Sequence, residues 1–126
     1  MPMLDRMFGL LGLSLDGVYL RQQALANNIA NADTPGYRRF DVVLQEAASA
    51  FRGRTDDPRH LPIGGSEAPA YRLVEDRGTR GSINGNNVDL DYELVSLADN
   101  ALRGETLVEI AGATLRRLTV VLREGR

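Results

Sequence analysis

The sequence predicts a mainly α-helical protein: a long helix at each end forming a coiled-coil pair, a short amphipathic helix, and an irregular middle region with minor β structure. Two observations carry this prediction. An apolar heptad pattern runs through each end of the chain, and the centre is rich in proline and glycine. We therefore expect residues 1–32 to form an N-terminal coiled-coil helix, residues 33–88 a turn, short helix and irregular region, and residues 89–126 a C-terminal coiled-coil helix.

The first heptad pattern alternates steps of four and three residues, which is typical of a coiled-coil seam. This N-terminal seam consists of Leu4, Phe8, Leu11, Leu15, Val18, Gln22, Leu25, Ile29 and Ala32. Gly9, Gly12 and Gly17 lie inside the same helix, and each costs roughly 1 kcal/mol relative to alanine. A helix weakened in this way is expected to need packing partners.

The second pattern, the C-terminal seam, has the same spacing. It consists of Leu90, Leu94, Leu97, Ala101, Gly104, Val108, Ala111, Leu115, Leu118 and Leu122. A chain that leaves by one helix and returns by the other places the two helices antiparallel, and we expect a register that sets Gln22 opposite Gly104. Two amphipathic helices in an ordinary helical core, or helices that pair between subunits, are the alternatives.

Local signals divide the middle of the chain. The first helix is expected to stop at the turn Thr34 to Tyr37, where Gly36 adopts a positive φ. Helical spacing of apolar residues predicts a short helix from about Asp41 to Arg52, and partial alternation predicts a short strand from Ala70 to Val74. Asp89 is a candidate N-cap for the last helix.

Composition excludes several classes of function. The net charge is −2 and acidic and basic residues are interspersed. The sequence therefore does not show the basic face that would predict a nucleic-acid partner. Cysteine is absent, which excludes disulfides and thiolate chemistry. The apolar run near the N-terminus is too short to span a membrane, and no small-residue cleavage site follows it, so we expect no cleaved signal peptide.

No constellation of residues predicts an enzyme, a cofactor, a metal ion or a small-molecule substrate. His60 is the single histidine and lies in the least structured stretch. The oxygen-rich residues 84–93 fail the calcium-loop spacing because Asp89 stands where glycine is required. Asp91 and Glu93 lie in the first turn of the expected last helix, and the positive end of the helix dipole accounts for acidic residues there.

Two motifs resemble one known family. Residues 23–39, Gln-Ala-Leu-Ala-Asn-Asn-Ile-Ala-Asn-Ala-Asp-Thr-Pro-Gly-Tyr-Arg-Arg, look like the N-terminal signature of the bacterial flagellar rod and hook proteins. Residues 84–91, Asn-Gly-Asn-Asn-Val-Asp-Leu-Asp, together with the short length, are similar to the proximal rod members of that family. The later Tyr-Glu-x-Asn element of the larger members is missing.

The resemblance implies a structural subunit of the flagellar basal-body rod that polymerises through its terminal helices. The implied partners are other copies of itself, other rod proteins, the membrane-ring adaptor and the flagellar export apparatus. The implied location is the periplasmic rod, reached without a cleaved signal peptide. A soluble coiled-coil adaptor or chaperone that binds a partner helix is the alternative function. We expect the assembly interface to consist of Leu4, Phe8, Leu11, Leu15, Val18, Gln22, Leu25, Ile29, Thr34, Pro35, Gly36, Tyr37, Leu94, Leu97, Val108, Leu115, Leu118 and Leu122.

Overall fold

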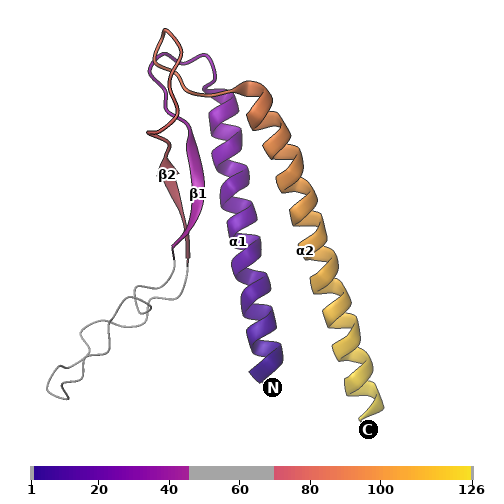
Figure 1. Ribbon diagram of the computed structural model, residues 1–126. Coiled ribbons are helices and arrows are strands. Elements are labelled where there is room, and N and C mark those ends of the chain that lie inside the picture. The colour runs from indigo at the N-terminus through magenta and orange to yellow at the C-terminus, as the bar shows by residue number, and fades with distance from the viewer. Residues whose placement is uncertain (1, 46–69, 126) are drawn as a thin grey trace, which may run out of the picture.

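The computed structural model describes residues 2–45 and 70–125, and these form two long helices and one β-hairpin (Figure 1). Helix α1 spans Pro2–Ala30 and helix α2 spans Leu90–Glu124. Strands β1 (Phe40–Gln45) and β2 (Ala70–Glu75) pair antiparallel, with Phe40 opposite Glu75 and Gln45 opposite Ala70. The prediction of a mainly helical fold with long terminal helices is confirmed, as is the short strand expected from residue 70.

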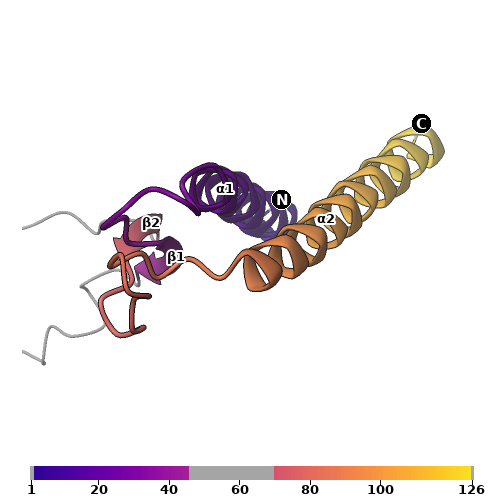
Figure 2. The same cartoon turned by 90° about the horizontal axis from the view of Figure 1, so that it is seen from above.

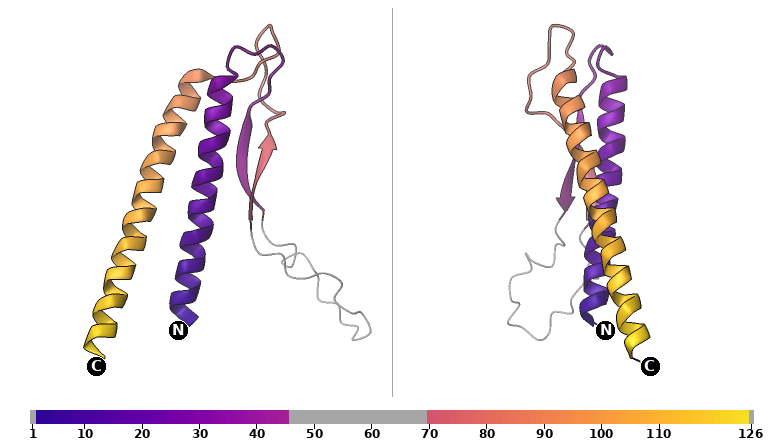
Figure 3. Two further views of the ribbon diagram at one scale, coloured as in Figure 1. Left: turned by 180° about the vertical axis from the view of Figure 1, so that it is seen from behind. Right: turned by 90° about the vertical axis from the view of Figure 1, so that its right-hand side faces the viewer.

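Helix α1 is the central element of the molecule. The hairpin packs on one of its flanks and α2 on another, and the two helices run antiparallel, so both chain termini lie at the same end (Figures 1 and 3). The helices are close where α1 ends and α2 begins, and they diverge toward the termini (Figures 1 and 2). The chain is therefore joined most tightly at the end opposite its termini.

The short helix expected from about Asp41 to Arg52 is wrong where the structure describes it, because Phe40–Gln45 is strand β1. The apolar spacing that suggested a helix is too short to distinguish the two forms. β-Branched Val42 and Val43 favour a strand, and β2 supplies the backbone partners that a strand needs. The rest of the expected helix, like His60, lies outside the described residues.

The local start and stop signals are confirmed. The amide of Tyr37 donates to the carbonyl of Thr34 at 3.2 Å, and Gly36 between them has a φ of +73°. The carboxylate of Asp89 accepts from the backbone N–H groups of Asp91 and Tyr92 at 3.1 and 3.3 Å, which is N-cap geometry for α2.

The expected register between the helices is wrong by about one helical turn. The Asn100 side-chain amide donates to the Val18 carbonyl and to Gln22 Oε1, both at 3.0 Å. A Cβ atom on Gly104 would lie 3.2 Å from Val18 Cγ1, so Gly104 packs against Val18 rather than Gln22. The buried residues of α2 are Glu93, Ser96 and Asn100, so a polar face of α2 sets the register instead of its apolar seam.

Candidate functional site

The interior of the described chain is more polar than apolar. Its buried hydrophobic residues are Leu11, Ala24 and Leu25. Most of the buried polar residues gather where α1 ends and α2 begins. Together with the half-buried Asp76 they form a group that we call the polar clamp, which consists of Asn28, Arg39, Asp76, Asn86, Asn87 and Glu93. Burying a polar group costs free energy unless the group is hydrogen-bonded, so each contact within the clamp contributes to the stability of the fold.

Asn28 joins the last turn of α1 to the first residue of β1. Its side-chain Nδ2 donates to the Phe40 carbonyl at 2.8 Å, and its Oδ1 accepts from the Phe40 amide at 2.9 Å. The side-chain amide thus replaces a neighbouring strand at this point. Asn28 Nδ2 also lies 3.2 Å from Glu93 Oε2, and Oδ1 accepts from the Tyr37 hydroxyl at 3.2 Å. Burial and the negative charge of Glu93 raise the pKa of Tyr37 above its usual value.

Arg39 and Glu93 form the ion pair at the centre of the clamp. Arg39 Nε lies 2.6 Å from Glu93 Oε1, and the Glu93 side chain is fully buried. The same guanidinium reaches Asp76 at 3.3 Å and Asp41 at 3.4 Å, and it lies 5.1 Å from the centre of the Tyr92 ring. Burial alone lowers the pKa of Arg39, but the bond to Glu93 and the nearby carboxylates outweigh it and raise that pKa, so Arg39 stays charged.

Asn86 and Asn87 of the second motif hydrogen-bond to the backbone of the first motif. Asn86 Nδ2 donates to the carbonyls of Asn31 and Thr34, both at 2.8 Å. Asn87 Oδ1 accepts from the Arg39 amide at 2.6 Å, while its Nδ2 donates to the Asp76 carbonyl at 2.9 Å. Residues about 50 positions apart in the sequence are thereby fixed to one another.

Asp76 closes the clamp on the hairpin side. Its carboxylate accepts from the Thr79 hydroxyl at 2.7 Å, from the Thr79 amide at 3.0 Å and from the Gly78 amide at 2.9 Å. The bonds from Thr79, then that from Gly78 and the bond to Arg39, lower the pKa of Asp76 from 3.8 to about 2 despite the opposing effect of desolvation. Asp76 is therefore ionised at neutral pH.

The structure divides the expected interface residues into two groups. On α1, Leu11 and Leu25 are buried, and the other apolar positions named as interface are half-buried. On α2, Leu97 and Leu118 are half-buried, whereas four positions are exposed. These are Leu94 (47%), Val108 (61%), Leu115 (52%) and Leu122 (60%), and with Ala101 they form a line at heptad spacing that we call the α2 stripe. Thr34, Pro35 and Gly36 are exposed and Tyr37 is half-buried.

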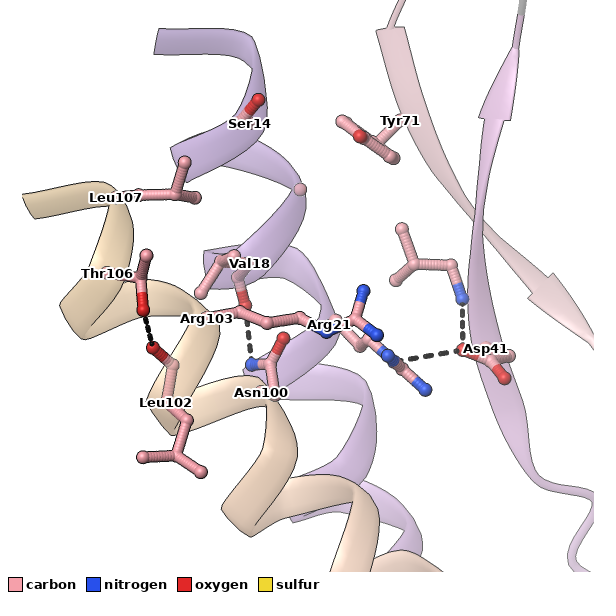
Figure 4. A pocket seen from close by; sticks show the side chains of 12 residues that line it. Ser14, Val18, Arg21, Asp41, Tyr71, Asn100, Leu102, Arg103, Thr106 and Leu107 are labelled. Carbon is pink, nitrogen blue, oxygen red and sulfur yellow. Dashed lines mark hydrogen bonds and ion pairs between the residues drawn. The ribbon is translucent and has the colours of Figure 1, made fainter. Parts of the chain in front are cut away.

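A groove of about 720 Å³ lies between α2 and the hairpin, with α1 as its floor (Figure 4). Arg21 faces Asp41 across it at 3.7 Å, and the Tyr71 ring covers Gly17 so closely that a Cβ there would lie 2.5 Å from Tyr71 Cε2. The Asn100 amide in the groove is already bonded to α1. This arrangement braces the hairpin against α1 and presents no paired nucleophile and base.

Two further features bear on chemistry. Among residues 2–45 and 70–125, no three His, Cys, Asp or Glu side chains are grouped so that they could bind a metal ion. Neither described helix combines the length and apolar character that crossing a membrane requires.

Comparison with known proteins identifies the family. A family model described as "Flagella basal body rod protein" matches residues 20–38. The flagellar basal body rod protein FlgB of Salmonella typhimurium is 34% identical over 137 aligned positions, covering 98% of this chain and 99% of the relative. The chain belongs to the FlgB family of flagellar basal body rod proteins. The FlgB proteins of Bacillus subtilis (33% identical, 85% of each chain) and Escherichia coli (31%, covering 98% of this chain and 99% of the relative) agree.

As a FlgB-family protein, this chain is a non-enzymatic structural subunit of the proximal rod in the flagellar basal body, and it assembles with other rod proteins. The residues that the family model matches include Asn28 of the clamp and end one residue before Arg39. Both motifs are recognisable in the sequence, but the bonds between them were not predicted from it. The signals in the sequence from which a mutual contact could be predicted are the adjacent asparagines in each motif and the opposite charges of Arg39 and Glu93.

Proposed function

We propose that the subunit polymerises through its terminal helices, with residues 1–32 and 89–126 in the packed shaft and residues 33–88 linking them. The single observation that carries the proposal is the α2 stripe. Five apolar positions in heptad register are exposed on a helix whose other face packs on α1. An apolar line of this kind is a surface that a neighbouring helix covers.

The assigned interface residues then have two roles. We propose that Leu94, Val108, Leu115 and Leu122 contact neighbouring subunits directly, because they are exposed in the single chain. Within one subunit, the buried positions Leu11 and Leu25 and the positions that contact α2, Val18 and Gln22, hold the helix pair in shape. The half-buried positions keep exposed surface with which they contribute to the contact between subunits; these are Leu4, Phe8, Leu15, Ile29, Leu97 and Leu118. At the end of the molecule that holds the polar clamp, the exposed residues Thr34, Pro35 and Gly36 add a further contact between subunits. The half-buried Tyr37 packs beneath this turn and holds it in place.

The proposed partners are further copies of this chain, other rod proteins and the membrane-ring adaptor at the base of the rod. The resemblance of both end motifs to axial proteins supports export by the flagellar secretion apparatus, without a cleaved signal peptide, to the periplasmic rod. The small apolar interior of residues 2–45 and 70–125 fits this route, because few buried apolar contacts leave little stability to overcome when the chain unfolds for export.

The experiment is a matched pair of substitutions on α2. Leu115→Asp puts a carboxylate in the α2 stripe, while Arg117→Asp puts the same group on an exposed position of the same helix two residues away. We expect Leu115→Asp to remove the chain from isolated basal bodies and to abolish motility, and Arg117→Asp to leave both intact. Both purified variants should keep the helical circular dichroism of the parent chain. A motile Leu115→Asp strain contradicts the proposal.

A further inference from the structure

The N-terminal half of α1 carries an apolar hollow that no described residue fills. We call it the α1 hollow. It has a volume of about 650 Å³ and is lined by Arg6, Phe8, Gly9, Leu10, Gly12, Leu13 and Asp16. A Cβ atom added at Gly9 or at Gly12 would have nothing within 4 Å, so the two glycines leave the helix backbone bare at its floor. Phe8, Leu10 and Leu13 make its walls apolar.

The α2 stripe presents the complementary shape. Leu115 and Leu122 project from the diverging half of α2, beyond the last buried residue of that helix, Asn100. A branched apolar side chain is the kind of knob that a bare helix surface flanked by apolar residues accepts. The first half of α1, which carries the hollow, and the last half of α2, which carries Leu115 and Leu122, both lie toward the end of the molecule that holds the two termini (Figure 1).

The α1 hollow is lined by one base, Arg6, and one acid, Asp16, and the acid is opposite in charge to a residue beside the α2 stripe. Asp16 stands at the rim of the α1 hollow, and Arg116 follows Leu115 directly on α2. Within residues 2–45 and 70–125, neither Asp16 nor Arg116 takes part in an ion pair. A contact that seats Leu115 in the hollow brings these opposite charges to the same edge, where they favour this pairing over a like-charged one.

We infer that the α1 hollow of one subunit receives the α2 stripe of a second copy of this chain, with Leu115 as the central side chain. The inference rests on the proposed polymerisation and names the two surfaces that meet. Because a hollow on one copy meets a knob on another, each contact leaves one hollow and one stripe unoccupied. Such a heterologous contact does not close on itself when its rotation fails to complete a ring, and it builds an open stack.

The test uses the absence of cysteine in the chain. Two full-length variants are co-expressed, one with Gly12→Cys and one with a single cysteine on α2, and isolated basal bodies are oxidised with diamide. Disulfides form when Cα atoms approach within about 7 Å. We expect linked peptides from one or more α2 stripe variants, namely Val108→Cys, Leu115→Cys and Leu122→Cys. The matched controls lie two residues further on and face away: Ile110→Cys, Arg117→Cys and Glu124→Cys.

Equal yields from stripe and control positions overturn the inference, and so does the absence of any disulfide when both chains are present in the basal bodies. Where Gly12→Cys itself blocks incorporation, Asp16→Cys at the rim replaces it and the same outcomes apply. A motile Leu115→Asp strain defeats the proposed polymerisation through the terminal helices instead, which separates the two failures.

Charge reversal gives a second, independent result. Asp16→Arg should lower incorporation severalfold because it faces Arg116 of the next copy, and the double variant Asp16→Arg with Arg116→Asp should restore it. If the second substitution adds to the defect rather than relieving it, the two residues do not meet and the proposed pairing of surfaces is wrong.

Discussion

Breaking the Arg39–Glu93 ion pair should separate the two ends of the chain at the polar clamp. The Nε–Oε1 distance is 2.6 Å, and the Glu93 side chain is fully buried. Removal of one partner of a buried pair costs about 3–5 kcal/mol, because the other charge is left without compensation. Glu93→Gln should lie near the lower limit, since Arg39 keeps its contacts to Asp76 and Asp41. Arg39→Met should lie near the upper limit, since Glu93 then keeps only the amide of Asn28.

A double-mutant cycle measures the pair itself. In Arg39→Met with Glu93→Leu, both charges are gone, and the buried volume is filled with apolar groups. We expect the double variant to lose about 2–3 kcal/mol less than the sum of Arg39→Met and Glu93→Leu. Urea unfolding of the purified chain, followed by circular dichroism at 222 nm, gives each free energy of unfolding. Single variants that cost less than about 1 kcal/mol, or costs that simply add, would refute the clamp as the joint between the ends.

Two further predictions concern single residues. Gly12→Ala should raise the free energy of unfolding by about 1 kcal/mol, because alanine favours the helix and its methyl group meets nothing within 4 Å. Gly17→Ala should lower the free energy of unfolding, because its methyl group clashes with Tyr71. The midpoints of urea unfolding of the two variants and the parent chain measure both effects. A gain at both positions would disprove the close hairpin contact. Asp76 has a lowered pKa of about 2, so its contribution is complete above pH 4 and is lost as the pH falls toward 2. Asp76→Asn should therefore flatten the loss of stability of the chain between pH 4 and pH 2, and parallel pH profiles for the two chains would contradict this.

The elements that the sequence predicted correctly are those with local chemistry. The long helices follow from heptads within each segment, the turn at Gly36 from a Pro-Gly pair, and the start of α2 from a capping aspartate. Each signal lies within a few residues of the feature it sets, so it is readable without knowing the fold.

The features that the sequence analysis missed depend on distant partners. Strand β1 is a strand because β2 lies beside it, although its own apolar spacing fits a helix turn equally well. The ion pair joins Arg39 to a residue 54 positions away. The helix register follows polar contacts such as Asn100 to Val18, whereas heptad matching assumed that the apolar seams face each other within one chain.

That difference has a functional meaning. A chain that buries its apolar seams internally has little left to offer a neighbour. Here the clamp residues hold the helices together at one end, while Leu115 and the rest of the α2 stripe stay exposed. The polar interior thus joins the two helices within one subunit and leaves the apolar line of α2 exposed.

Hydrogen exchange on the full-length chain, measured once as a confirmed monomer and once in isolated basal bodies, tests this account most directly. In the monomer we expect slow exchange near the clamp, over residues 20–30 and 92–104, and fast exchange over residues 108–124, where no described residue is buried. In the rod, residues 108–124 should become protected. Strong protection of residues 108–124 in the monomer, or no gain of protection there on assembly, would contradict the claim that the exposed half of α2 is the surface that joins subunits.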